Sequence, residues 1–298
     1  MLTTLMLRRP ALAFTTRAIS MSPAYRSQEF NKDGMPRETE TVKHFIAHKQ
    51  GYDKHSQDYL MPHPIWSKEE AENVQITHEK PKGITDKLAY LTVKTMRRSF
   101  DLLSGYTVGK QFQTLDERAV VNRCIFLETV AGVPGFTAAM VRHLHSLRRM
   151  ERDHGWIHTL IEEAENERMH LMTFLQLRKP GPLFRLSVQI TQFLFTGAFF
   201  LTYQISPKFC HRFVGYLEEE AVVTYTDIIK MIDIGHLPMW KSLVAPDIAI
   251  KYWELEHSAK MKDVILAIRA DEAHHRHVNH TLASLKTKGQ ANPFKAGE

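Results

Sequence analysis

The sequence predicts an all-α fold, a four-helix bundle with two further helices beside it. The first observation behind this prediction is a pair of Glu-x-x-His motifs, Glu167/His170 and Glu272/His275. Residues three apart share one face of a helix, so each motif directs a carboxylate and an imidazole to the same point. Two such motifs on two helices are half of the inward-facing ligand set of ferritin-like di-iron bundles.

Two single glutamates supply the other half of this set. Glu128 lies in the apolar run IFLETVA, and Glu218 lies in the run LEEEAV. A buried carboxylate costs several kcal/mol unless it is protonated, paired with a cation or bound to a metal. The four groups are 39, 51 and 54 residues apart, which fits one group on each long helix. Carboxylates with two imidazoles suit iron or manganese and disfavour copper or a closed zinc site.

Other acidic groups compete with this assignment: the pairs Glu151/His154 and Glu254/His257, and Glu163. The first pair lies in a charged run that ends in glycine, which predicts a solvated turn. The second pair lies 18 residues, or five helical turns, before the motif at 272 and 275, so spacing alone does not exclude it. Glu163 lies one turn before Glu167 and also stays open, although only Glu167 has the Glu-x-x-His spacing.

Apolar periodicity and Gly or Pro breaks predict the order of the helices. We expect helices at residues 85–106, 116–148, 156–178, 186–207, 208–233 and 246–286. Pro134, between two glycines, predicts a kink just past Glu128. The run Lys-Pro-Gly at 179–181 is a stop signal for the helix that carries Glu167.

The segment 186–207 predicts contact with a membrane. It carries no charge and is long enough to cross a bilayer. Helices that carry ligands lie on both sides of it in the sequence, however, and these must meet in one compartment. We therefore expect this helix to lie in the membrane surface beside helix 85–106, whose Lys94, Arg97 and Arg98 reach the level of the headgroups.

Composition limits the class of protein and its organisation. The formal charge is +6, but four arginines lie in residues 1–28, and the rest of the chain carries only +2, which does not favour nucleic-acid binding. Two cysteines cannot build a disulfide framework or a thiolate zinc site. Residues 1–28 contain no acid and have the composition of a mitochondrial transit peptide. We expect an extended arm at 29–84, the helical domain at 85–290 and a tail at 291–298.

Four longer segments resemble the iron-binding boxes of the alternative oxidase family, the cyanide-insensitive ubiquinol oxidases of mitochondria. They are LETVAGVPG from 127, EEAENERMH from 162, LEEEAV from 217 and RADEAHHR from 269. The resemblance runs from about residue 60 to about 285 and favours Glu272 over Glu254. His277 departs from the family, which often carries Asp there.

The resemblance implies a function and its cofactor. It implies two iron ions per chain, held by Glu128, Glu167, His170, Glu218, Glu272 and His275. The implied reaction oxidises two ubiquinols and reduces O₂ to water by four electrons without pumping protons. The implied setting is the matrix side of the mitochondrial inner membrane, with the chain attached to one leaflet as a homodimer. Two rival functions are a ferritin-like iron store and a di-iron hydroxylase of ubiquinone precursors.

The resemblance also assigns residues around the metal. The quinol pocket falls on Arg97, Asp101, Arg123, Leu127, Leu217, Glu220, Ala221 and Thr224. Residues that hold the ligands in place fall on Asn166, His211, Trp253 and Asp271. Tyr225 matches the redox tyrosine of the family. His211, Glu218 and Tyr225 are seven apart and form one stripe on a helix, so a purely structural role for the tyrosine is the alternative.

Overall fold

Helices joined by short loops make up the part of the chain that the structure describes. The structure is a computed structural model, and it describes residues 61–111, 115–285 and 289–297, which fall in one unit, residues 61–298. Within these ranges the only β-bridge is an isolated one between Val244 and Lys260. The predicted all-α fold is confirmed here. The expected transit peptide and the first half of the expected arm lie outside the described residues.

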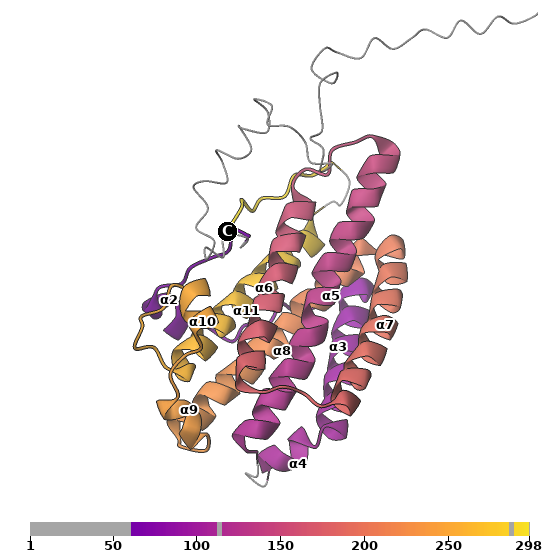
Figure 1. Cartoon of the computed structure of the whole chain (residues 1–298). Helices are drawn as coiled ribbons and strands as arrows, with labels where there is room; N and C mark the ends of the chain where they lie inside the picture. Colours follow the sequence, from indigo (N-terminus) through magenta and orange to yellow (C-terminus); the bar gives the residue numbers. More distant parts are fainter. Residues whose placement is uncertain (1–60, 112–114, 286–288, 298) are drawn as a thin grey trace, which may run out of the picture. The chain divides into compact units, whose positions relative to one another are not determined.

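The helices are numbered as in Figure 1. They are α2 (Lys68–Glu72), α3 (Ile84–Leu103), α4 (Tyr106–Gln111), α5 (Glu117–Arg149), α6 (Trp156–Leu177), α7 (Pro182–Ile205), α8 (Pro207–Asp233), α9 (Pro238–Ser242), α10 (Asp247–Tyr252) and α11 (Met261–Ser284).

Four long helices form the bundle (Figure 1): α5 packs along α6, and α8 packs along α11. The first pair approaches closely because glycines lie at the crossing. A Cβ atom on Gly135 would lie 2.6 Å from the backbone oxygen of Leu160, and one on Gly132 would lie 3.2 Å from that of Ala164. Pro134 lies between these glycines without ending α5. The sequence GVPG therefore sets how closely α5 and α6 pack beside Glu128.

The buried apolar side chains form two clusters, and each bundle helix contributes to both. One cluster includes Ile125 of α5, Phe174 of α6, Ile228 of α8 and Ile265 of α11. The other includes Ala138, Leu160, Phe213 and Val278 of the same four helices. On α5, α8 and α11 the expected ligands fall between the two clusters in the sequence, and on α6 they lie between Leu160 and Phe174. The two apolar clusters thus lie on either side of a polar layer.

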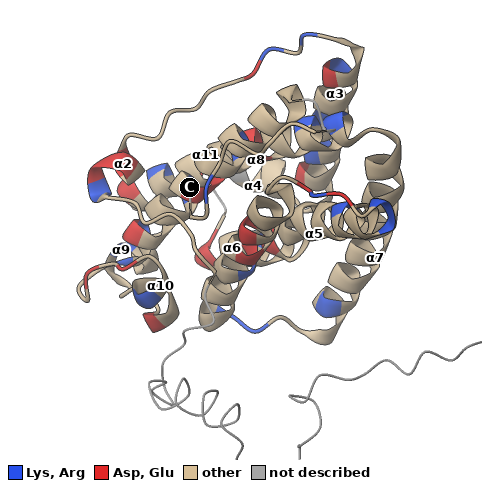
Figure 2. Cartoon of the chain, turned by 90° about the horizontal axis from the view of Figure 1, so that it is seen from above, with Lys and Arg blue, Asp and Glu red and all other residues tan. Residues whose placement is uncertain are grey.

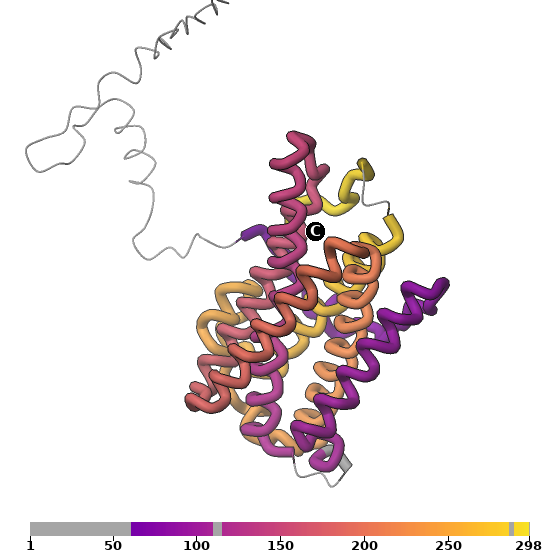
Figure 3. The backbone as a smooth tube through the Cα atoms, turned by 90° about the vertical axis from the view of Figure 1, so that its right-hand side faces the viewer, coloured from indigo at the N-terminus to yellow at the C-terminus, as the bar shows by residue number. Residues whose placement is uncertain are grey.

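Two helices, α3 and α7, cover the same flank of the bundle. Figure 3 shows α7 across α5 and α8, and α3 along α8. Only Phe199 and Tyr203 of α7 are buried, and Arg185 is its only charged residue, so α7 appears almost uncharged in Figure 2. By length and composition alone, α5 and α7 are each apolar enough to cross a membrane, but 39% of the apolar window of α5 is buried and only 6% of that of α7.

The prediction of one continuous helix at 246–286 is wrong. The chain leaves the helix after Tyr252 and starts α11 at Met261, where the Asp263 carboxylate accepts a hydrogen bond from the Lys260 backbone N–H. Glu254 has a left-handed backbone with a φ of 51°, which no continuous α-helix allows. Glu254 and His257 are exposed in this loop. They do not lie on a helix with Glu272 and His275, so the spacing argument that made them alternative ligands does not apply.

The first predicted helix, 85–106, also differs from the structure in detail. It ends at Leu103, and the chain turns at Gly105, whose φ of 70° suits glycine, before the short helix α4 begins. The turn lets Tyr106 fold back into the protein, where it is buried. Glu151 and His154 lie exposed between α5 and α6, in the turn that their sequence predicts.

Candidate metal centre

Six acidic and imidazole side chains from the four bundle helices meet in the polar layer. They form two overlapping groups: Glu128, Glu167, His170 and Glu272, and Glu167, Glu218, Glu272 and His275. Within each group one possible ligand atom per residue lies within 4.8 Å of all the others, and all six residues are buried. These are the six residues that the sequence predicts as ligands. Because the groups share Glu167 and Glu272, they could hold two metal ions close to each other.

The two imidazoles direct their Nδ1 atoms at the carboxylates. His170 Nδ1 lies 3.4 Å from an oxygen of Glu128, 3.4 Å from one of Glu167 and 3.5 Å from one of Glu272. His275 Nδ1 lies 2.8 Å from Glu167 Oε1. The two rings are nearly parallel, with centroids 6.2 Å apart. One imidazole therefore belongs to each group.

The cluster leaves buried polar atoms without hydrogen bonds. These atoms are Glu128 Oε2, both carboxylate oxygens of Glu167, His170 Nδ1 and His275 Nδ1, because the contacts between the imidazoles and the carboxylates lack the geometry of a hydrogen bond. Buried polar atoms are normally paired, and each unpaired one requires an explanation. All of them belong to the six converging side chains, and a cation between them would satisfy them together. The donor set therefore fits a metal centre.

Burial and mutual repulsion oppose ionisation of several of these carboxylates. Burial, followed by the charge of Glu167, raises the pKa of Glu272 to about 8, and burial raises the pKa of Glu128 to about 7. Burial and the charges of Glu272 and Glu167 raise the pKa of Glu218 well above its ordinary value. Without a cation, the protein holds these groups partly protonated near neutral pH. A bound metal ion would favour the ionised form and release those protons.

Asp271 organises the side of the centre next to α10. Its Oδ2 lies 3.0 Å from His170 Nε2 and accepts hydrogen bonds from Asn166 Nδ2 at 3.0 Å and Trp253 Nε1 at 2.8 Å. Its Oδ1 accepts a bond of 2.6 Å from Trp66 Nε1. Burial would raise the pKa of Asp271, but the bond to His170 and the other donors hold it below its usual range. The ionised carboxylate therefore fixes the orientation of the His170 ring.

Three of the four residues expected to hold the ligands in place meet in this way, whereas His211 does not reach the six. Its Nδ1 lies 3.2 Å from Asn279 Oδ1 and its Nε2 lies 3.0 Å from the hydroxyl of Tyr203. Asn279 in turn donates to the backbone oxygen of His275 and to Glu163. Burial lowers the pKa of His211 to about 4, so its ring is neutral. His211 therefore acts on the centre only through Asn279.

Glu163, the competing carboxylate on α6, belongs to neither group. Both of its oxygens lie 3.1 Å from Asn279 Nδ2, and burial raises its pKa to about 7. The structure also brings in Trp66, which sequence reasoning did not connect with Asp271 because 205 residues separate the two. The tryptophan in the segment HPIW of an otherwise polar arm was the only available signal.

Tyr225 lies on α8 but bonds to the glutamate of α5. Its hydroxyl donates a short hydrogen bond to Glu128 Oε1, and its ring stacks on Phe174. Burial, the charge of Glu128 and the neighbouring Cys124 raise the pKa of the phenol well above its ordinary value. The tyrosine therefore keeps its proton and donates a hydrogen bond to a candidate metal ligand.

A large, mostly apolar cavity opens between α3, α5, α7 and α8 and reaches the centre. Its volume is about 510 Å³, and its inner wall contains Glu128, Glu218, Glu272 and Tyr225. Six of the eight residues expected for a quinol pocket line it: Arg97, Leu127, Leu217, Glu220, Ala221 and Thr224. The walls also include Cys124, Phe100 and Phe126, which sequence reasoning did not single out.

The two other expected pocket residues, Asp101 and Arg123, lie behind this wall and support it. Asp101 accepts bonds from Arg97 Nε at 2.8 Å and from Arg123 at 2.5 Å. The guanidinium of Arg123 lies over the ring of Tyr106 at 3.9 Å. Arg97 then donates to Thr224 Oγ1 at 2.8 Å and to the backbone oxygen of Glu220 at 3.1 Å. A chain of polar contacts thus positions Arg97 and Thr224 in an otherwise apolar wall.

The chain is similar to known proteins over most of its length. A family model described as alternative oxidase matches residues 66–284. A protein of Trypanosoma brucei brucei named "Alternative oxidase, mitochondrial" is 53% identical over 234 residues, which cover 78% of this chain and 70% of the relative. Proteins of the same name from Emericella nidulans and Aspergillus niger are 52% and 50% identical, and the matches cover 78% of this chain and 68% and 69% of theirs.

Proposed function

The chain belongs to the alternative oxidase family, and we propose that it is a di-iron oxidase that transfers electrons from ubiquinol to O₂. The observation that carries this proposal is the cavity, which joins an apolar flank of the protein to three of the six converging side chains. Ligand pockets are typically apolar with a few well-placed polar groups. An iron store has no use for such a cavity.

The six converging side chains would hold the two iron ions. Their oxygens and imidazole nitrogens suit iron, and their unpaired buried atoms fit bound cations. A pair of irons would supply electrons to O₂ two at a time. Asp271 keeps the Nδ1 atom of His170 directed at the carboxylates through its contact with Nε2.

The quinol head would bind in the cavity near Arg97, Thr224 and Tyr225, which all line it. The guanidinium of Arg97 and the hydroxyl of Thr224 are the polar groups that can orient a quinol oxygen. The apolar walls would exclude water and accept the isoprenoid tail. Tyr225 lines the cavity beside Glu128, to which its hydroxyl is hydrogen-bonded, and it can give up its hydroxyl hydrogen during O₂ reduction. Two ubiquinols release four electrons and four protons, which one O₂ takes up to form two waters.

Attachment to one membrane leaflet is the second part of the proposal. Exposed apolar side chains continue from α3 to α7, on the flank where the cavity lies; Leu91, Leu102, Leu103, Ile190, Phe193, Leu194 and Leu201 are each more than half exposed. A lipid surface would cover them and deliver ubiquinol to the cavity. The composition of residues 1–28 and the word mitochondrial in the names of the relatives support a mitochondrial location, and within it we propose the inner membrane.

A homodimer is supported by a second exposed stripe. Phe136, Met140, Leu144 and Leu147 recur every three or four residues along α5, and all four are exposed. Residues at this spacing lie on one face of a helix. A second copy of the chain offers the same stripe, so the two can pair around a two-fold axis.

Oxygen uptake driven by a soluble ubiquinol analogue tests the function. We expect cyanide-insensitive uptake of one O₂ for every two quinols, and iron in the purified protein by metal analysis. The double substitution Glu167→Ala with Glu272→Ala should remove both iron and activity, whereas Glu254→Ala should change neither. Iron binding without quinol turnover would indicate a store, and oxygen incorporated into the quinone ring would indicate a hydroxylase.

A further inference from the structure

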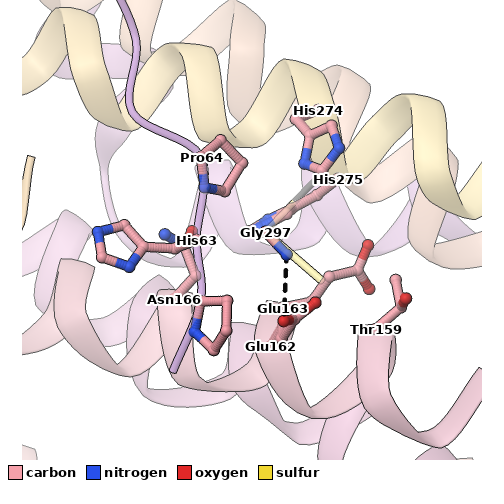
Figure 4. A pocket seen from close by; sticks show the side chains of 10 residues that line it. His63, Pro64, Thr159, Glu162, Glu163, Asn166, His274, His275 and Gly297 are labelled. Carbon is pink, nitrogen blue, oxygen red and sulfur yellow. Dashed lines mark hydrogen bonds between the residues drawn. The ribbon is translucent and has the colours of Figure 1, made fainter. Parts of the chain in front are cut away.

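A second, much smaller pocket lies beside the metal centre and is separate from the apolar cavity. Its volume is about 20 Å³, and its walls include Thr159, Glu163, Asn166 and His275. None of these residues lines the large cavity. Figure 4 shows the pocket between α6, α11 and two extended segments of chain. Because His275 is one of the six converging side chains, the pocket borders the centre.

The pocket contains a buried acceptor that lacks a partner. Asn166 is only 3% exposed. Its Nδ2 donates to the Tyr252 hydroxyl at 2.9 Å and to Asp271 at 3.0 Å, whereas its Oδ1 has no hydrogen-bond partner. A water molecule needs a cavity of roughly 10–15 Å³ and two or more polar neighbours. The volume and the polar walls of this pocket therefore fit one water molecule.

The outer wall of the pocket comes from two segments far apart in the sequence. Pro62 to Pro64 form one part of it, and Gly297 forms another and donates its backbone N–H to Glu162 at 3.2 Å. Figure 4 draws this hydrogen bond as a dashed line. These residues are extended, and no helix forms this part of the wall.

Three residues hold the tail 289–297 against the bundle. The Gln290 backbone oxygen accepts a hydrogen bond from Trp156 Nε1 at 2.8 Å, the Phe294 ring packs edge-on against His274 and His277, and the third residue is Asn292. Asn292 Nδ2 donates to Thr159 Oγ1 at 2.6 Å and to the backbone oxygen of Gly155 at 3.1 Å. The backbone N–H of Asn292 donates to the backbone oxygen of His154 at 3.0 Å. Most of the other residues of the tail are exposed. Segments with few buried contacts open at a small free-energy cost. The tail can therefore open without unfolding the bundle.

We propose that this pocket is a water site in a polar passage to the metal centre, and that tail residues 289–297 act as its lid. The proposal rests on the proposed function, in which each O₂ yields two waters next to a cavity filled by an apolar quinol. Water is poorly accommodated by apolar walls but well accommodated by the Asn166 amide, the Thr159 hydroxyl and the Glu163 carboxylate. The two entrances thus separate the apolar substrate from the polar product.

Exchange of metal-bound water in the Mn²⁺-substituted full-length protein tests the passage. Water-proton relaxation measures this exchange rate without any turnover. We expect Asn292→Ala to speed the exchange by about fivefold, which corresponds to roughly 1 kcal/mol of lost closing free energy, as for one hydrogen bond. Ala291→Ser, at an exposed position of the same tail, is the matched control and should keep the parent rate.

A substitution in the other entrance makes the experiment decisive. Leu194→Trp narrows the apolar cavity, and it should leave the exchange rate unchanged. A slower exchange in Leu194→Trp together with an unchanged rate in Asn292→Ala would overturn the passage, because water would then move through the apolar cavity. A crystal structure with no water beside Asn166 Oδ1 would also overturn it. Failure of Mn²⁺ to bind would instead reject the proposed metal centre, and the passage with it.

Discussion

The two sides of the metal centre are built differently. On the side of α3 and α7, called here the cavity side, about 510 Å³ of mostly apolar space reaches Glu128 and Glu218. The side of α10, Trp66 and the tail is called here the network side. There three N–H donors and the Nε2 atom of His170 surround Asp271, and the pocket has a volume of only about 20 Å³. The difference assigns access to the cavity side and rigid positioning of the ligands to the network side.

Tyr225 lies where the cavity side meets the centre, and Tyr225→Phe should give the largest effect. We expect activity to nearly vanish while metal content and melting temperature stay close to the parent values, because only the hydroxyl that bonds to Glu128 is lost. Steady-state oxidase assays with metal analysis measure this. Tyr216→Phe is the control, since Tyr216 is a buried tyrosine of the same helix whose hydroxyl has no hydrogen-bond partner. Parent-like activity in Tyr225→Phe would make the tyrosine structural.

Asp271→Asn probes the network side and should act mainly on the metal. The neutral amide no longer stabilises His170, so we expect metal affinity to fall by about 10- to 100-fold. Competition with a chelator of known affinity measures the change. Glu163→Gln, a change of the buried carboxylate outside both ligand groups, should leave the affinity unaltered. Equal losses in the two variants would show that any buried charge matters, and not the network around Asp271.

Substitutions in the wall of the cavity should weaken quinol binding and leave the metal content unchanged. Arg123→Ala and Thr224→Ala are each expected to raise the KM for quinol by about five- to tenfold, the value of one hydrogen bond of roughly 1 kcal/mol. The first change removes support from Asp101 and Arg97, and the second removes a partner of Arg97. Arg98→Ala, an exposed neighbour, controls for loss of positive charge. Unchanged quinol kinetics in both variants would remove this wall from the substrate site.

The smallest expected effect is a change of folding stability with pH, which should differ between the metal-free and the metal-loaded protein. Glu128 and Glu272 have pKa values of about 7 and about 8 in the folded protein, above the ordinary value of 4.5, because they are buried. Between about 4.5 and about 8 these two carboxyls therefore bind more protons in the folded state than in the unfolded chain. The lowered pKa of His211, about 4, opposes this below about 6.5, so we expect stability to fall as the pH rises through 7 and 8. Burial would lower the pKa of His275, but Glu167 raises it to about 9, so this imidazole also makes the folded protein less stable as the pH rises.

Thermal unfolding across this pH range, with and without metal, measures that trend. The metal-free protein should lose melting temperature as the pH rises through 7 and 8, whereas the metal-loaded protein should not, because the metal replaces the protons. A metal-free protein that is most stable at the upper end of this range would contradict the assignment of burial as the dominant cause.

The sequence by itself predicted the all-α class, the helices that carry the candidate ligands and the family. It did so because helical geometry makes spacing local: residues three apart, such as Glu167 and His170, meet on one face wherever the helix lies. The break between Tyr252 and Met261 was not predicted, because residues 253–260 contain no Gly or Pro to mark the end of a helix. The turn is stabilised instead by Asp263 and by the burial of Trp253.

Only the tertiary structure decided which side chains from different helices touch. Tyr225 was expected along the stripe of Glu218, yet it bonds to Glu128, 97 residues away. Trp66 reaches Asp271 across 205 residues, and His211 is directed at Asn279 and not at a ligand. The rotation of each helix about its axis selects such pairs. That rotation depends on packing at points such as Gly135 against Leu160, which involve residues distant in the sequence.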